Sequence, residues 1–115
     1  MKIFVCYTLR DGQITELVLK KIHKYLSEYG EVFIDLLDNK DHDRQEKVIS
    51  ELMNCNRVVV IETKGTYDSE WVKLELDLSS KLGKIIFRLN IDEFMLAIKE
   101  NFDIFTSLPN DNHQK

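Results

Sequence analysis

The residue that most strongly suggests chemistry is an acid on the apolar side of a predicted helix over residues 67–82. At about 100° per residue, Glu75 falls inside the apolar arc of this helix, one turn from Trp71. A carboxylate that faces a protein core is costly unless it is paired, protonated or lining a pocket. Glu75 is therefore our first candidate for a catalytic or binding group. The apolar residues of the arc are Trp71, Val72, Leu74, Leu76, Leu78 and Leu82.

The elements that must position Glu75 follow from the hydrophobic pattern. Short apolar runs predict buried strands, and segments with helical periodicity alternate with them. Asp68 or Ser69 can cap the N-terminus of the helix that carries Glu75, and Gly83 can end it. The predicted strands cover residues 3–7, 32–34, 58–61 and 84–89, and the predicted helices cover residues 14–29, 44–54, 67–82 and 91–101.

The order β-α-β-α-β-α-β-α predicts an α/β fold. We expect a single three-layer domain over residues 1–108, with a four- or five-stranded parallel sheet and helices on both faces. Residues 36–43 are predicted to form a loop, residues 104–105 could form a short edge strand, and residues 109–115 are predicted to be a polar C-terminal tail. In such sheets ligands bind outside the carboxyl ends of the strands. Glu75, whose helix follows the third strand, is expected to point into a crevice there.

Composition and charge argue against several classes of partner. The chain has 115 residues, a net charge of -4 and no basic block, so we expect no nucleic-acid or anionic-membrane partner. No apolar run approaches a membrane span, and the N-terminus enters a strand pattern without a signal peptide, which predicts a cytoplasmic protein. Cys6 and Cys55 are expected to be reduced core thiols. The 3 histidines show no ligand spacing, so we expect no metal site.

Several short motifs resemble those of Toll/interleukin-1 receptor (TIR) domains, especially the compact bacterial TIR-like proteins. The run SEWVKLE resembles the family pattern Ser-x-Trp-x-x-x-Glu, and VFID after a glycine resembles its second strand. The resemblance covers about residues 1–90, in the family's order. The matching segments are residues 3–8 (IFVCYT, followed by Asp11), 30–35 (GEVFID), 56–61 (NRVVVI), 69–75 (SEWVKLE) and 83–86 (GKII).

The resemblance implies a flavodoxin-like sheet. In the enzymatic members it also implies cleavage of the bond between nicotinamide and ribose in NAD. It places Glu75 at the family's essential glutamate and Trp71 at the tryptophan beside the substrate pocket. Tyr7 and Thr8 fall at the end of the first strand, which lines the same pocket. We include Asp35, at the end of the second strand, among the substrate-binding candidates.

Two features depart from the family pattern. The loop at residues 36–43 lacks the Pro-Gly or Ala-Gly that many TIR domains carry there. Because that loop governs self-assembly and substrate access in the family, its different character bears on both properties. Leu9 occupies a position that is basic in some NAD-cleaving members, and Arg10 could substitute as a substrate-binding residue.

The chemistry needs little more than one well-placed acid. Breaking the nicotinamide-ribose bond expels a neutral leaving group and builds positive charge on the ribose, as in glycoside hydrolysis. A carboxylate such as Glu75 can stabilise that charge, and does so more strongly in a partly dry pocket than in water. The indole of Trp71 offers a flat face to a ring or a cation.

Each candidate also has a purely structural interpretation. Glu75 could be a buried acid paired with a basic side chain, Trp71 and Tyr7 could be ordinary core residues, and Asp35 could cap a helix or turn. The basic side chains that could pair with Glu75 are those of Lys64, Arg10 and Arg88.

The sequence therefore predicts a TIR-like protein that acts on NAD as a substrate, with no separate cofactor. It would hydrolyse NAD or form a cyclic ADP-ribose-type product, and family analogy suggests antiphage defence and association with itself or with other TIR domains. One alternative is a non-catalytic TIR module that works by assembly. Another is an enzyme similar to nucleoside deoxyribosyltransferases, which share the layout and a catalytic glutamate on the corresponding helix.

Overall fold

A parallel sheet forms the centre of the computed structural model, which describes residues 1–40 and 42–107. Its strands run in the order β2-β1-β3-β4, and all three neighbouring pairs are parallel. This arrangement confirms the predicted α/β class, with four strands and a flavodoxin-like three-layer fold. The strands are β1 (Lys2–Cys6), β2 (Glu31–Phe33), β3 (Arg57–Glu62) and β4 (Ile85–Asn90).

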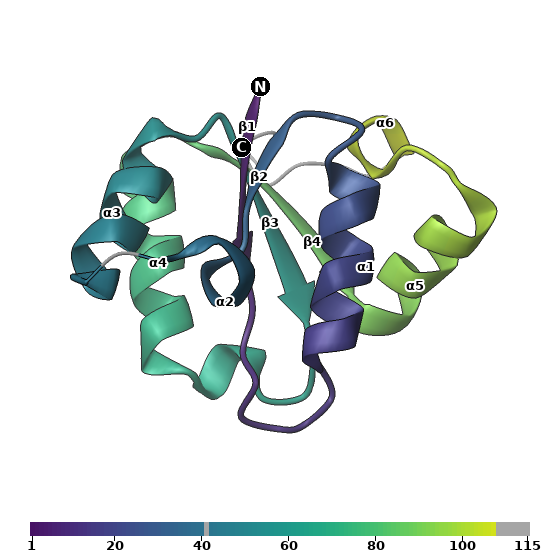
Figure 1. Cartoon of the computed structure of the whole chain (residues 1–115), viewed down its shortest axis with the longest axis horizontal. Helices are drawn as coiled ribbons and strands as arrows, with labels where there is room; N and C mark the ends of the chain where they lie inside the picture. Colours follow the sequence, from purple (N-terminus) through teal and green to yellow (C-terminus); the bar gives the residue numbers. More distant parts are fainter. Residues whose placement is uncertain (41, 108–115) are drawn as a thin grey trace.

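Helices cover both faces of the sheet (Figure 1). Helices α1 and α5 pack together on one face, and α3 and α4 pack together on the other. Among the described residues, no helix has the length and apolarity needed to cross a membrane. The longer helices are α1 (Glu16–Leu26), α3 (Arg44–Asn54), α4 (Glu70–Lys81) and α5 (Ile91–Glu100), and the short ones are α2 (Asp35–Asp38), the 3₁₀ helix η1 (Thr66–Asp68) and α6 (Ile104–Ser107).

Alternation along the strands divides the core into two layers. Successive strand side chains point to opposite faces, so Ile3 and Val5 of β1 pack under α1 and α5. Phe4 and Cys6 of the same strand pack under α3 and α4. Cys6 and Cys55 are free and buried, as predicted. Cys6 therefore lies on the face of the sheet that α4 covers.

Two short segments differ from the sequence prediction. The predicted loop at residues 36–43 is partly helical, because α2 forms over Asp35–Asp38. The segment at residues 104–105 belongs to α6 and not to an edge strand. The reason is that its side chains cover a face of the sheet: Ile104 is fully buried, and the Phe105 ring packs edge-on against that of Phe87 with 5.0 Å between centroids.

The buried face of α4 also differs from the predicted apolar arc. Leu74 and Leu82, predicted to face inward, are 44% and 41% exposed. The fully inward positions are Val72, Glu75 and Ser79. The predicted tail at residues 109–115 lies outside the described residues.

Candidate active site

The carboxyl ends of β1 and β2 and the N-terminal half of α4 meet on one side of the sheet. The chain leaves β1 at Cys6, and α2 begins directly after β2. In Figure 1, α2 lies beside the sheet between α4 and α1. This is the region in which parallel α/β sheets bind ligands.

Glu75 lies on the inner face of α4 and is 5% exposed. The helix is well formed around it, since the Ser69 side chain caps the N-terminus by accepting from the Val72 N–H at 3.2 Å. One turn after Glu75, the Ser79 hydroxyl donates to the Glu75 backbone carbonyl at 2.7 Å. The predicted inward orientation of this carboxyl group is confirmed.

The surroundings of Glu75 favour its protonated form. Burial raises the pKa of this carboxyl to about 8. Hydrogen bonding from the Cys6 thiol and the Trp71 side chain lowers the pKa in part, and the negative charge of Asp35 raises it. Desolvation is the largest of these effects because a charge in a poorly hydrated site loses the solvation that water gives it.

No ion pair among the described residues includes Glu75. The basic side chains considered as partners lie elsewhere: Lys64 and Arg10 are exposed. Arg88 donates to the Tyr67 hydroxyl at 2.8 Å, and its guanidinium lies over the Tyr67 ring. The alternative in which Glu75 is a structural acid paired with one of these basic side chains is therefore not supported by the structure.

Trp71 lines a small pocket, and its side chain also hydrogen-bonds to Glu75, which itself is not one of the residues that line the pocket. The pocket has a volume of about 210 Å³ and lies where the start of α2, helix α3 and the first turn of α4 meet. Ligand pockets usually measure about 300–1,000 Å³, so this one suits a single ring, and a larger ligand would extend over its rim. The pocket is lined by Asp35, Arg44, Gln45, Val48 and Trp71.

Asp35 is held by α3 and by the loop before it. Its carboxylate forms an ion pair with Arg44 at 3.3 Å and accepts from the Asn39 amide at 2.7 Å. The Asn39 amide also donates to the Arg44 carbonyl at 3.0 Å. These contacts differ from the helix or turn cap considered for Asp35, and the negative charge of Asp35 acts on Glu75.

Tyr7 connects the end of β1 to α2. Its hydroxyl accepts from the Leu36 N–H at 2.9 Å, and burial raises the pKa of Tyr7 to about 12. Asp35 and Glu75 both contribute to that shift, so all three groups share one neighbourhood. The structure thus brings together Tyr7, Asp35, Trp71 and Glu75.

Thr8 and Arg10 belong to the loop after β1. The buried Thr8 hydroxyl accepts from the Arg10 N–H at 3.3 Å, which is a local turn contact. The Arg10 side chain is exposed. The structure shows no contact between either side chain and Glu75.

Three residues near the site are not among the candidates predicted from the sequence: Cys6, Asn39 and Arg44. Cys6 could have been found, because strand alternation places it on the same face of the sheet as α4. Asn39 and Arg44 carry no such signal. Their partner is Asp35, and the contact depends on how the chain turns between α2 and α3.

The chain matches no family model. It is similar to TIR2 of Cytobacillus dafuensis, a protein whose name describes it as a candidate cyclic ADP-D-ribose synthase. The two are 23% identical over 99 residues, which cover 79% of this chain and 25% of that protein. The chain therefore spans about a quarter of the length of this curated relative. This distant similarity suggests a TIR-like relationship, the same direction in which the sequence motifs point.

Proposed function

We propose that this chain is a TIR-like domain that cleaves the nicotinamide-ribose bond of NAD, with Glu75 as the essential carboxyl group. The observation that carries the proposal is a buried acid that forms no ion pair with any described residue and that hydrogen-bonds to Trp71, a residue lining a small pocket near the carboxyl end of the sheet. The name of the distant relative supports a cyclic ADP-ribose-type product, and hydrolysis to ADP-ribose is the other outcome of the same bond cleavage.

The environment of Glu75 suits this reaction. As nicotinamide leaves, positive charge develops on the ribose, and a carboxylate in a poorly hydrated site stabilises that charge more than water does. With a pKa of about 8, Glu75 is mostly protonated at neutral pH in the free protein. The nicotinamide ring of NAD is itself a cation, so substrate binding favours the ionised form of Glu75.

The remaining candidate residues would bind NAD or form the walls of the site. The indole of Trp71 would stack on a flat ring in the small pocket. Tyr7 and Asp35 would form the wall beside Glu75. Thr8 and Arg10, in the loop after β1, would contact the part of NAD that extends beyond the pocket.

The test is NAD consumption by purified protein at high concentration, with products separated by chromatography. Glu75→Ala and Glu75→Gln should each reduce turnover by about 100-fold or more, because they remove a group that acts on developing charge. Glu70→Gln is the matched control, since Glu70 lies on the same helix but is exposed and forms an ion pair with Lys73 on the helix surface. It should retain wild-type activity.

Two results would contradict the proposal. Equal activity of the Glu75 variants and the wild type would show that another group is responsible. If neither the wild type nor any of the three variants cleaves NAD, even at high concentration, a non-catalytic assembly module would be favoured. A parallel screen with deoxynucleosides distinguishes the deoxyribosyltransferase alternative.

A further inference from the structure

Helix α2 forms one wall of the candidate site and is too short to be stable alone. It has only 4 residues, and the residue before it, Ile34, provides no side-chain cap. Isolated helices shorter than about 12 residues are marginal in water, so contacts outside the helix must hold α2 in place. Within the turn, the Asp38 carboxylate accepts from the Ile34 N–H at 2.7 Å and so joins the end of α2 to the residue before it.

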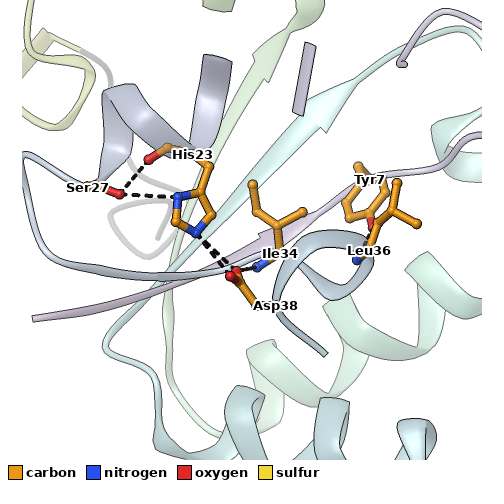
Figure 2. A network of polar contacts seen from close by, with 6 residues as sticks. All are labelled: Tyr7, His23, Ser27, Ile34, Leu36 and Asp38. Atoms are coloured by element: carbon orange, nitrogen blue, oxygen red, sulfur yellow. Dashed lines mark hydrogen bonds and ion pairs between the residues drawn. The ribbon is translucent and has the colours of Figure 1, made fainter. Parts of the chain in front are cut away.

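Asp38 also joins α2 to helix α1. Figure 2 shows the His23 ring directed at the Asp38 carboxylate. The ring Nε2 lies 3.2 Å from one carboxylate oxygen and 3.1 Å from the other. The two side chains are 31% and 29% exposed, so the pair is partly shielded from water yet open to exchange protons with it.

The contacts of His23 are best satisfied when the ring is doubly protonated. On one side, Nε2 faces a carboxylate, which only accepts when ionised. On the other side, Nδ1 lies 3.3 Å from the Ser27 hydroxyl. That hydroxyl has a single proton and lies 2.7 Å from the His23 carbonyl, to which it donates. A neutral ring lacks one of the two donors, and its hydrogen bond to Asp38 loses the assistance of charge.

The opposite side of α2 contacts the candidate site. The Leu36 N–H donates to the Tyr7 hydroxyl at 2.9 Å, as Figure 2 also shows. Asp35, the first residue of α2, lines the pocket beside Trp71. Displacement of α2 would therefore move two of the groups that surround Glu75.

We propose that His23 and Asp38 are positioning residues that hold α2 against the site more tightly when His23 is protonated than when it is neutral. The link from α2 to catalysis rests on the proposed function, whereas the attachment of α2 does not. Loss of the His23 proton weakens the contact with Asp38, loosens the turn and exposes the Leu36 N–H.

Other charged groups surround the pair without sharing this behaviour. Among residue types in general, histidine is the one whose charge changes most readily near neutral pH. Lys20 pairs with Glu16, and Lys47 pairs with Glu51. The charged neighbours are Lys20 and Lys24 of α1 on the side of His23, and Lys2, Glu31, Lys47 and Glu51 on the other side of Asp38.

Amide exchange measured by NMR tests the proposal without NAD. Between pH 5.5 and 8, the protection factor of the Leu36 N–H in the wild type should fall about three- to tenfold, the difference between a charge-assisted and a neutral hydrogen bond. His23→Gln should show the low value at both pH values. Asp38→Asn should also show the low value at both pH values, because its neutral side chain cannot form the charge-assisted contact with His23. The turn itself should be kept, because the amide oxygen can still accept from the Ile34 N–H.

His42→Gln is the matched control, since His42 is exposed, and it should keep the wild-type pH dependence. Protection of the Leu36 N–H that does not change with pH in the wild type would overturn the proposal. A pH dependence that persists in His23→Gln would overturn it as well. If NAD cleavage is confirmed, the wild type should exceed His23→Gln in kcat/KM at pH 5.5, and the two should converge at pH 8. Because amide exchange needs no substrate, it distinguishes failure of this proposal from failure of the proposed function.

Discussion

At the scale of a single residue, Glu75 shows how a candidate active-site group can lower the stability of the folded protein. Burial raises the pKa of this carboxyl to about 8, and it also raises the pKa of the neighbouring Cys6 thiol. Two acids thus remain protonated where a well-packed core would hold two apolar side chains. Such shifted groups gather at functional sites more often than elsewhere.

Glu75→Gln should stabilise the protein increasingly as the pH rises. The unfolded chain releases the Glu75 proton near its ordinary pKa of 4.5, whereas the folded chain keeps it until about pH 8. The folded state therefore binds more protons between these values, and the wild type loses stability as the pH rises through this window. Each pKa unit is worth about 1.4 kcal/mol, so the gain of the variant over the wild type should grow by roughly 3–5 kcal/mol across the window.

Urea unfolding at pH 4.5, 6 and 8 measures this gain. Above about pH 8 the difference between the variant and the wild type should stay constant. Glu70→Gln, which changes an exposed acid of the same helix, serves as the reference. Parallel stability profiles for Glu75→Gln and the wild type would show that the acid is already ionised in the folded protein at neutral pH.

At the scale of an element, α4 positions Glu75 through its N-terminal cap. The sequence allowed Asp68 or Ser69 as the cap, and the structure selects Ser69, with Asp68 in the preceding 3₁₀ helix. The bond to the Val72 N–H satisfies one of the backbone donors that the first turn of a helix leaves without an intrahelical partner. A change at Ser69 therefore affects the stability of the helix that carries Glu75.

Ser69→Ala should lower the free energy of unfolding by about 1–2 kcal/mol. The upper part of this range is expected because the Val72 N–H that it leaves without an acceptor is buried. Ser80→Ala is the control, since Ser80 lies on the same helix and is exposed, and its effect should stay within about 0.5 kcal/mol. Equal denaturation midpoints for the two variants would contradict the role of the cap.

At the scale of the whole molecule, the loops after β1 and β3 are joined to each other beside the site. The Asp11 carboxylate accepts from the Thr63 hydroxyl at 2.7 Å and from the Gly65 N–H. Gln13 accepts from the Lys64 N–H at 2.7 Å. A Cβ at Gly65 would lie 3.0 Å from an Asp11 carboxylate oxygen, so a larger residue there would require the Asp11 side chain to shift by a few tenths of an ångström. These contacts connect segments that are about fifty residues apart.

Asp11→Asn should destabilise the protein at neutral pH and have little effect in acid. Hydrogen bonds from Thr63, Gln13 and Gly65 lower the pKa of Asp11 below its ordinary value of 3.8. The unfolded state therefore takes up the proton first as the pH falls. The stability that Asp11 contributes is present above its ordinary pKa and is lost as the pH falls through the folded-state pKa.

Urea midpoints at pH 7 and pH 2.5 measure this effect. The difference between the wild type and Asp11→Asn should be clear at pH 7 and smaller at pH 2.5. A difference of the same size at both values would mean that the ionised carboxylate is not the group that holds the two loops together.

The sequence by itself determined the order of the strands and longer helices and the inward orientation of Glu75. Both are local properties. Apolar runs and their periods depend on residues close together in the chain. Helix geometry alone places Glu75 on the same side of its helix as Val72. The similarity to TIR domains also rests on such short runs. The surroundings of Glu75 were only partly predictable, since Trp71 and Tyr7 were named but Cys6 was not.

Only the tertiary structure decided the parts that depend on contacts between distant segments. Helix α2 forms because Asp38 meets both Ile34 and His23. The residues at 104–105 are helical because their side chains cover the face of the sheet at Phe87. Leu74 and Leu82 are exposed, whereas Val72, Glu75 and Ser79 are the buried residues of α4. For α2 and α6, part of the free energy comes from a partner in another element, His23 or Phe87, which no local pattern can reveal.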